Sequence, residues 1–250
     1  MSSPPRRKRL DLLLVEKAFA PSRARAQATI KAGKVRVAGQ LVLKPAQEVD
    51  PDAEIAVESL DHPYVSRAAL KLVHALDHFG INCRDKYCLD LGASTGGFTQ
   101  VLLERGAGRV VAIDVGHGQL SPLVAQSPRV LSLEGMNAKD LTADLFECLP
   151  ELLVSDLSFI SLKKALPVAL ALAAPGAMLA ALIKPQFEAG RERVGRGGIV
   201  RDPALHEEIC EDISRWLADE QGWQVRGITP SPIEGGDGNR EFLIVAVKHA

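Results

Sequence analysis

The chain has 250 residues, of which 46% are hydrophobic and 24% charged, a composition that excludes wholesale disorder and is typical of a folded globular protein. The length favours a medium domain with a smaller one attached. The net charge of −1 hides an asymmetry, because residues 1–45 contain eleven lysines and arginines against two acids, a net of +9. This split predicts a part that binds polyanions, with a merely solvated basic face as the alternative.

The sequence predicts a cytoplasmic protein without stable membrane insertion. Its four cysteines have no C-x-x-C spacing, which favours buried, reduced thiols and argues against a metal site. The basic N-terminus is not followed by the uninterrupted apolar segment of an export signal. The run 165–183 carries no charge, but Pro167 and the Pro175-Gly176 pair divide it. We therefore expect a helix, a turn and a strand buried on both faces instead of a membrane span.

The first sixty residues predict a small α+β domain. Ser22 is placed to cap a helix, and Gly33 is a natural stop for it. The apolar spacing and the turn residues indicate helices over 10–18 and 22–32, a hairpin of strands 35–37 and 41–43, and a further strand at 55–57. We expect this domain, with its basic tail, to occupy 1–60 and to be followed by a linker at 61–65.

Residues 66–250 alternate strands with helices, which is the pattern of a doubly wound α/β domain. Ser66 is placed to cap a helix over 67–79. The seven strand candidates are 87–91, 110–114, 130–133, 152–155, 178–183, 224–228 and 242–247. Because a Pro/Gly loop joins the last two strands, the parallel sheet can end with an antiparallel strand.

A glycine-rich segment follows the first strand of this second domain. Its spacing, G-x-x-x-G-G from Gly92, matches neither the dinucleotide pattern nor the phosphate loop. Asp114 ends the next strand, where an acid can accept both ribose hydroxyls of a nucleoside. This order fits S-adenosylmethionine, although a simple strand-to-helix turn is the alternative. The predicted cofactor-binding residues are Asp90, Gly92, Ser94, Thr95, Gly96, Gly97, Phe98, Asp114 and Asn137.

Asn137 follows the third strand and can hydrogen-bond an adenine edge, although a helix cap or a turn residue explains it equally well. Asp156 and Lys184 end the fourth and fifth strands, at the edge where open α/β sheets bind ligands. With Lys71 and Glu241 they would form an acid–base cluster. Taken singly, a surface lysine or an edge-strand glutamate is the simpler interpretation.

The motifs together resemble a known family. Arg9-Leu10-Asp11, Ser22-Arg23 and the glycines at 33 and 39 resemble the RNA-binding domain first described in ribosomal protein S4. The segments 66–72, 90–98, 154–160 and 184–188 resemble the FtsJ-like methyltransferases. Joined in this order, they resemble the TlyA family, ribose methyltransferases of ribosomal RNA that are also labelled haemolysins.

The resemblance implies an α/β fold with a Rossmann-like seven-stranded methyltransferase sheet and a small N-terminal S4-like domain. It implies 2'-O-methylation, of cytidine in ribosomal RNA or ribosomal subunits, with S-adenosylmethionine as cofactor and no metal. The matching catalytic tetrad is Lys71, Asp156, Lys184 and Glu241, with Lys184 accepting the proton or orienting the hydroxyl. Glu241 rests on a short motif. The expected RNA-binding residues are Arg9, Arg23, Arg25, Lys31, Lys34 and Arg36.

Two alternatives stay open at this point. A non-catalytic RNA-binding or ribosome-assembly factor could retain the same fold and bind the cofactor without turnover. A membrane-active haemolysin is suggested by the family label and by the run 165–183.

Overall fold

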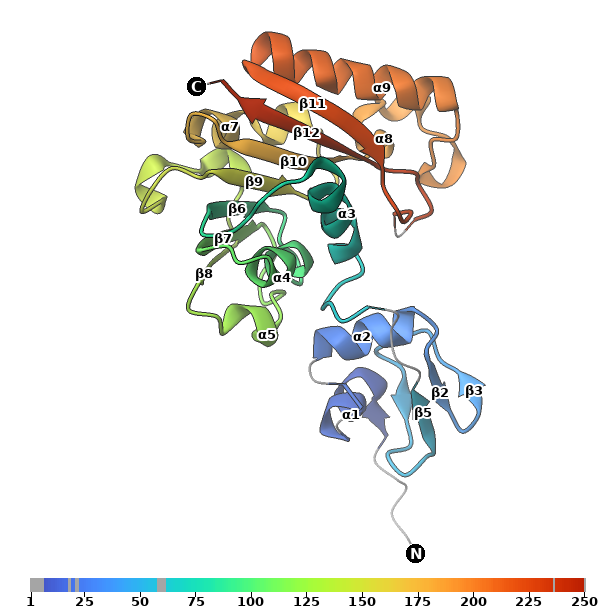
Figure 1. Cartoon of the computed structure of the whole chain (residues 1–250). Coiled ribbons are helices and arrows are strands. Elements are labelled where there is room, and N and C mark those ends of the chain that lie inside the picture. Colours follow the sequence, from blue (N-terminus) through green and yellow to red (C-terminus); the bar gives the residue numbers. More distant parts are fainter. Residues whose placement is uncertain (1–6, 18, 21–22, 58–61, 236, 250) are drawn as a thin grey trace, which may run out of the picture. The chain divides into compact units, whose positions relative to one another are not determined.

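The computed structural model describes residues 7–17, 19–20, 23–57, 62–235 and 237–249 (Figure 1). The chain forms two compact units, one over 1–67 together with 121–123 and the other over 68–120 together with 124–250. Part of the predicted linker 61–65 lies outside the described residues, so this boundary remains a proposal.

The first unit packs two helices against short strands. Leu10, Leu13, Leu14 and Ile30, on the inner faces of the helices, are buried with Val35 of the sheet. Strands β2, β3 and β5 form an antiparallel sheet in the order β3-β2-β5, and β1 pairs with β4. The elements are β1 (Lys8–Arg9), α1 (Leu10–Glu16), α2 (Arg23–Lys31), β2 (Val35–Val37), β3 (Gln40–Leu41), β4 (Glu48–Val49) and β5 (Ile55–Val57).

The structure changes some predicted details of this unit. The strand predicted at 41–43 is only Gln40–Leu41, although the N–H of Val42 still donates to the carbonyl oxygen of Val35 at 3.0 Å. The β1–β4 pairing has no signal in the sequence, since each strand has only two residues. The predicted cap Ser22 and the predicted helix end at residue 18 lie outside the described residues.

The second unit contains a seven-stranded sheet in the order β11-β12-β10-β9-β6-β7-β8. Neighbouring strands from β10 to β8 are parallel, whereas β12 lies antiparallel between β10 and β11. The predicted seven-stranded α/β sheet with a late antiparallel strand is therefore confirmed. The strands are β6 (Tyr87–Leu91), β7 (Arg109–Asp114), β8 (Val130–Glu134), β9 (Leu152–Ser155), β10 (Met178–Ile183), β11 (Trp223–Pro230) and β12 (Phe242–Lys248).

Helices cover both faces of this sheet (Figure 1). Apolar side chains of α7 and α9 join one face in a single core, and α3 and α4 contact strands of the sheet as well as each other. The helices are α3 (Ala69–Phe79), α4 (Gly97–Glu104), α5 (Pro122–Ala125), α6 (Leu162–Ala165), α7 (Pro167–Leu172), α8 (Pro185–Glu188) and α9 (Pro203–Arg215). Short turns of other helix types are η1 (Ala138–Asp140), η2 (Ala143–Leu145), η3 (Arg191–Arg193), η4 (Arg196–Gly198) and the π-helical η5 (Trp216–Glu220).

The predicted cap of α3 is wrong. The helix begins at Ala69, so Ala68 and not Ser66 occupies the cap position.

The uncharged run 165–183 forms the end of α6, α7 and the strand β10, in which 179–183 are buried. The expectation of a helix, a turn and a buried strand is thus confirmed. In the described part of the chain, no helix is both long and apolar enough to cross a membrane.

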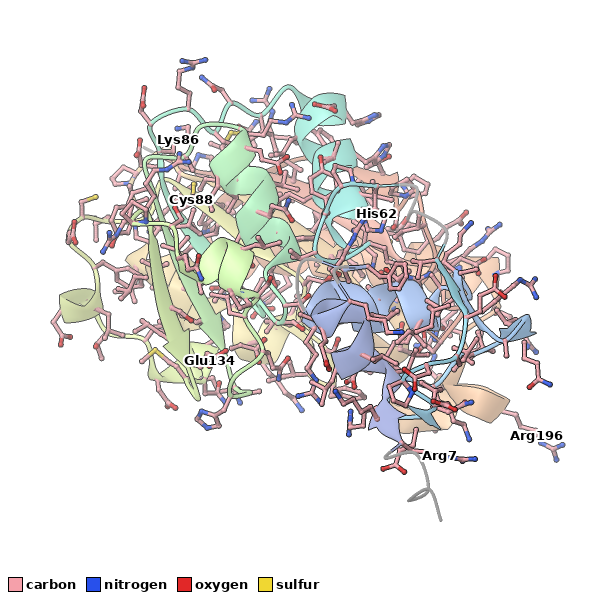
Figure 2. All side chains as sticks on the ribbon, turned by 90° about the horizontal axis from the view of Figure 1, so that it is seen from below. Arg7, His62, Lys86, Cys88, Glu134 and Arg196 are labelled. Carbon is pink, nitrogen blue, oxygen red and sulfur yellow. The ribbon has the colours of Figure 1, made fainter. Side chains whose placement is uncertain are left out.

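The cysteines differ in environment. Cys83 and Cys88 are buried, and burial raises the pKa of the Cys83 thiol to about 11. Cys88 lies on β6 close to Lys86 in the sequence (Figure 2). Cys148 is exposed, so the expectation that all four thiols are buried is wrong.

The central strand β6 gives a direct test of the sheet. Leu89→Ala should lower the unfolding free energy of the second unit by about 3 kcal/mol, because Leu89 is fully buried and its truncation leaves a cavity. Urea unfolding followed by tryptophan fluorescence measures this, since Trp216 and Trp223 both lie in the second unit. Leu149→Ala, at a side chain that is 45% exposed, should change the value by less than about 0.5 kcal/mol. Equal effects would contradict the assigned core.

Candidate active site

The backbone of the loop that follows β6 lies close to the backbone of the segment that follows β9. Gly92 has φ of +85°, and a Cβ there would lie 3.0 Å from the carbonyl oxygen of Asp156. Gly96 caps α4 with φ of +92°, a conformation that side chains other than glycine rarely adopt. The glycines thus allow the loop to pass directly beside the segment that follows β9.

Asp114, at the end of β7, holds this loop in place. Its Oδ2 accepts the backbone N–H of Ser94 at 2.8 Å, and its Oδ1 accepts that of Gly116 at 2.7 Å. A carboxylate oxygen has two lone pairs, so each can accept a further hydrogen bond from a ligand hydroxyl.

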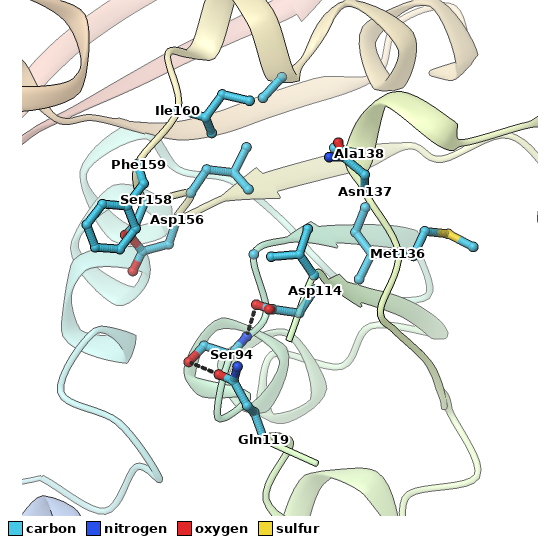
Figure 3. A pocket seen from close by; sticks show the side chains of 15 residues that line it. Ser94, Asp114, Gln119, Met136, Asn137, Ala138, Asp156, Ser158, Phe159 and Ile160 are labelled. Carbon is cyan, nitrogen blue, oxygen red and sulfur yellow. Dashed lines mark hydrogen bonds between the residues drawn. The ribbon is translucent and has the colours of Figure 1, made fainter. Parts of the chain in front are cut away.

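A second carboxylate fixes the neighbouring loop, which follows β7. Glu134, at the end of β8, accepts the backbone N–H groups of Leu120, Gly118 and Gln119 at 2.6–3.1 Å, and these bonds lower its pKa. The fixed loop directs the Gln119 side chain toward Ser94, whose Oγ donates to Gln119 Oε1 at 3.2 Å (Figure 3). Sequence reasoning missed both Gln119 and Glu134.

These loops enclose a cavity of about 480 Å³ at the carboxyl ends of the parallel strands (Figure 3). That volume is in the range of small-molecule sites. The lining combines apolar walls with Asp114 and Asn137 and, among the described residues, includes no lysine or arginine. It therefore suits an uncharged nucleoside better than a phosphate. The lining residues are Gly92, Ser94, Ile113, Asp114, Val115, Gln119, Met136, Asn137, Ala138, Asp156, Leu157, Ser158, Phe159, Ile160 and Ala165.

Asp90 lies beneath the glycine loop, fully buried and outside the cavity lining. Its Oδ2 accepts the hydroxyl of Thr99 at 2.6 Å, whereas its Oδ1 has no hydrogen-bond partner in the described part of the chain. Burial raises the pKa of Asp90 to about 7. A buried carboxylate oxygen without a donor is costly, so burial favours the protonated form of this side chain.

Lys184, directly after β10, forms the first buried polar pair of the site. Its Nζ lies 2.6 Å from Asp156 Oδ1 and donates to Ser158 Oγ at 2.9 Å. The lysine side chain is 9% exposed and the aspartate 15%. The hydrogen bond to Ser158 directs one ammonium N–H, whereas the contact with Asp156 is an ion pair without hydrogen-bond geometry, so the other N–H groups can reach a ligand atom in the adjoining cavity.

Lys71 and Glu241 form the second pair, in which Lys71 Nζ donates to Glu241 Oε2, with both side chains buried. Strand register explains why the two pairs share one edge of the sheet. Ile183 pairs with Phe242 across β10 and β12, so Lys184 and Glu241 each lie one residue beyond the same paired position. Lys71 reaches this edge because α3 contacts β12.

The sequence analysis assigned no role to two further residues near Glu241. A Cβ on Gly235 would lie 2.7 Å from Glu241 Oε1, so glycine leaves room for the carboxylate. Asn239 is fully buried, accepts the N–H of Val200 and donates to the carbonyl of Gly198, both at 2.9 Å. It thereby ties the loop before β12 to the glycine-rich loop that contains the exposed Arg196 (Figure 2).

A groove adjoins the cavity. It is lined by α8, the loop after β9 and the loop 190–198, and Phe159 and Ile160 line both spaces. Phe159 is 91% exposed, with φ of +65°, and its ring centroid lies 5.2 Å from that of Phe187. An exposed aromatic ring in a strained backbone conformation, next to a buried polar cluster, is typical of a ligand-contacting position.

Comparison with known proteins identifies the family. Residues 64–248 match the FtsJ-like methyltransferase model, and residues 8–55 match the S4 domain model. The chain belongs to the TlyA family of FtsJ-like methyltransferases. It is 46% identical over 240 residues to the 16S/23S rRNA (cytidine-2'-O)-methyltransferase TlyA of Mycobacterium tuberculosis, covering 96% of this chain and 89% of that protein.

Other TlyA relatives carry different names. Hemolysin A of Brachyspira hyodysenteriae is 43% identical, with 94% of this chain and 98% of that protein covered. A solved structure of a hemolysin-named protein from Streptococcus thermophilus superposes with a TM-score of 0.76 at 39% identity, covering 99% of this chain and 90% of that one. The predicted family and fold are confirmed.

The residues that the sequence predicts to bind the cofactor differ in where they lie. Gly92, Ser94, Asp114 and Asn137 line the cavity, and Asn137 Oδ1 also caps η1 by accepting the N–H of Lys139, so both of its predicted roles are compatible. Phe98 is buried in α4. Asp90 lies in β6, and Thr95, Gly96 and Gly97 belong to the loop and the start of α4; none of these four residues lines the cavity.

The predicted RNA-binding residues lie in the first unit and have unequal surroundings. Lys31 and Arg36 are exposed. Arg25 is partly buried and donates to the carbonyl oxygens of Tyr64 and, at 2.6 Å, His62, so part of its donor capacity is used within its own unit. Arg9 and Arg23 both contact Asp11. Lys34 is half-buried.

The close approach at Gly92 can be tested by binding. Gly92→Ala should weaken S-adenosylmethionine binding about tenfold, because the methyl group strains the positive φ and displaces the Asp156 backbone. Gly176→Ala is the matched control, since Gly176 has φ of +74° and no other atom lies within 4 Å of the place that its methyl group would take. Isothermal titration of both variants checks this, and equal affinities would show that the contact with Asp156 does not shape the site.

Proposed function

We propose that this chain transfers a methyl group from S-adenosylmethionine to the ribose 2'-hydroxyl of cytidine in ribosomal RNA. The main support is the pair of buried lysine–carboxylate contacts, Lys184–Asp156 and Lys71–Glu241, at the sheet edge that borders the cavity. The cytidine and ribosomal assignments come from the names of the relatives in M. tuberculosis and Campylobacter jejuni. Such a substrate implies that the protein acts in the cytoplasm.

The cavity residues fit the proposed cofactor. Asp114 would accept the ribose hydroxyls, Asn137 would face the adenine edge, and the walls formed by Ile113, Met136 and Leu157 would enclose the flat base. When bound, the cofactor supplies a methyl group on a positively charged sulfur that is a good leaving group. Much of the rate should then come from positioning the acceptor hydroxyl.

Lys184 is the group we assign to the acceptor hydroxyl. Ser158 accepts one N–H of its ammonium group and Asp156 holds the group by an ion pair, which leaves N–H groups for the 2'-oxygen. During transfer the sulfur–methyl bond would break as the O–CH₃ bond forms, and the O–H bond breaks. Its proton would go to Lys184 where that side chain is the neutral amine, or to solvent where Lys184 stays an ammonium and only orients the oxygen. Lys71 and Glu241 would organise the nucleoside from the other side of the same edge.

The groove beside the cavity is the space we assign to the RNA nucleoside. Exposed aromatic rings bind single-stranded bases by stacking, at about 1–3 kcal/mol per base. Phe159 borders both spaces and contacts Phe187, so a base stacked there would place its ribose near Lys184. The basic first unit would supply phosphate contacts that add affinity with little sequence readout.

Lys184 gives the most direct test of the reaction. Lys184→Ala should lower kcat for methyl incorporation into ribosomal subunits at least about a hundredfold, because the hydroxyl loses its orienting and proton-accepting partner. S-adenosylmethionine affinity should change little. Lys86→Ala, which removes a lysine before β6, is the control and should retain activity.

Lys184→Arg separates the two roles of this lysine. Arginine keeps the charge and the donors but does not accept a proton. We expect it to be as inactive as the alanine variant, and substantial activity would assign Lys184 to orientation alone. Incorporation by Lys184→Ala equal to wild type would remove Lys184 from the chemistry, and wild type that binds the cofactor without turnover would favour a non-catalytic RNA-binding factor.

Phe159 tests the acceptor side. Phe159→Leu should raise the KM for RNA about tenfold through loss of stacking, whereas Phe159→Tyr should retain the wild-type value. Steady-state kinetics with varied RNA at saturating S-adenosylmethionine measures both. A KM for the leucine variant that matches wild type would place the base elsewhere.

A further inference from the structure

Asp11 is a fully buried carboxylate in the first turn of α1, and arginines on two elements contact it. Arg9 binds it through two atoms, with Nε 3.0 Å from Oδ1 and Nη2 2.9 Å from Oδ2. Arg23, the first residue of α2, donates from Nε to Oδ2 at 2.9 Å, and Gln27 Nε2 donates to the same oxygen at 2.9 Å. One carboxylate therefore links the starts of both helices.

The charges of this cluster are tightly coupled. Burial alone would raise the pKa of Asp11, but hydrogen bonds from Arg9, Gln27 and Arg23 outweigh it and hold the pKa well below its ordinary value. The carboxylate is thus ionised across the physiological range. With two guanidinium groups around one carboxylate, the cluster keeps a net charge of +1 on a surface with few other acids nearby in the sequence.

The contacts leave a defined part of each guanidinium facing solvent. The side chain of Arg23 is 54% exposed and that of Arg9 is 39% exposed, whereas Asp11 is completely covered. In the described part of the chain, Arg23 uses only its Nε, so both of its Nη groups remain available. Those two groups form the edge of a guanidinium that binds a phosphate through parallel hydrogen bonds.

We propose that Asp11 is a positioning residue for RNA binding, which holds Arg9 and Arg23 as a preorganised pair of phosphate-binding guanidiniums. This inference rests on the proposed function, since it takes an RNA phosphodiester as the partner. Holding both side chains before binding removes part of the rotamer entropy that long side chains lose on contact. The buried Asp11 carboxylate would then strengthen the binding of an RNA phosphate, because it fixes the two arginines that lie between these anions.

A positioning role for Asp11 and its charge alone predict opposite changes in RNA affinity when the carboxylate is neutralised. Asp11→Asn removes a negative charge near the RNA, so electrostatics alone would tighten binding. If Asp11 positions the arginines, the same variant should weaken binding, because an amide cannot accept four donors and loses the ion pairs. We expect Kd for RNA to rise about tenfold, with a shallower dependence of log Kd on log salt.

The experiment measures binding of a fluorescein-labelled RNA hairpin to the full chain by anisotropy at several salt concentrations. Glu16→Gln is the matched control, because it removes a carboxylate from the same helix that pairs with Lys8 and not with either arginine. Its affinity should equal or slightly exceed that of wild type. Asp11→Asn that is folded by circular dichroism and binds as tightly as this control would overturn the inference.

Two lysine variants keep the test decisive if Asp11→Asn does not fold. Arg23→Lys and Arg9→Lys retain the charge but lose the guanidinium edge, and each should weaken binding several-fold while S-adenosylmethionine affinity stays unchanged. Wild-type affinity in both would overturn the inference. Where Asp11→Asn does fold, it should weaken binding less in an Arg23→Ala background than in wild type, because only Arg9 then remains for Asp11 to position; full additivity would contradict this.

The outcomes also separate this inference from the proposed function. A wild-type chain that binds S-adenosylmethionine but no RNA, and methylates none, would contradict the proposed function itself. A wild-type chain that binds RNA, with affinity unaffected by the Asp11 and arginine variants, would overturn only the positioning role.

Discussion

The antiparallel pairing of β12 with β10 is the constraint on which the candidate active site depends. Residues far apart in the chain, Lys184 and Glu241, lie at one sheet edge because Ile183 and Phe242 are paired directly before them. Burying these charges is expensive unless each has a close partner. The pairing supplies that condition, since Asp156 reaches Lys184 from the parallel neighbour β9 and Lys71 reaches Glu241 from α3. A one-residue slip in register would leave unpaired charges in the interior.

Carboxylates that accept backbone hydrogen bonds shape the cofactor cavity. Asp114 and Glu134, at the ends of adjacent parallel strands, accept hydrogen bonds from backbone N–H groups of the loops that follow β6 and β7. Loops without regular structure thus acquire a fixed shape, and Gln119 becomes part of the wall. Asp11 plays a related part in the first unit, where a buried acid links two helix starts. Buried or strand-end acids therefore organise both units of the chain.

The sequence predicted features that local chemistry determines. All seven strands of the large sheet, the glycine loop and Asp114 follow from apolar runs, turn residues and strand ends, and the structure places them as expected. It did not predict which lysine pairs with which acid, because that depends on the register between β10 and β12. Nor did it predict Gln119, whose role arises from backbone contacts of Glu134. Ser66 looked like a cap only because the start of α3 was expected two residues too early.

The position of β12 between β10 and β11 has a consequence for biosynthesis. The last strand of the chain is inserted into the interior of the sheet, so β10 stays an unpaired edge until the C-terminal segment has been made. Pairings between distant segments form late in folding, and exposed strand edges favour aggregation in the meantime. The Lys71–Glu241 pair cannot exist before this insertion. A chain in which β12 has not yet been inserted would therefore lack a complete active site, so the catalytic pairs form only together with the finished sheet.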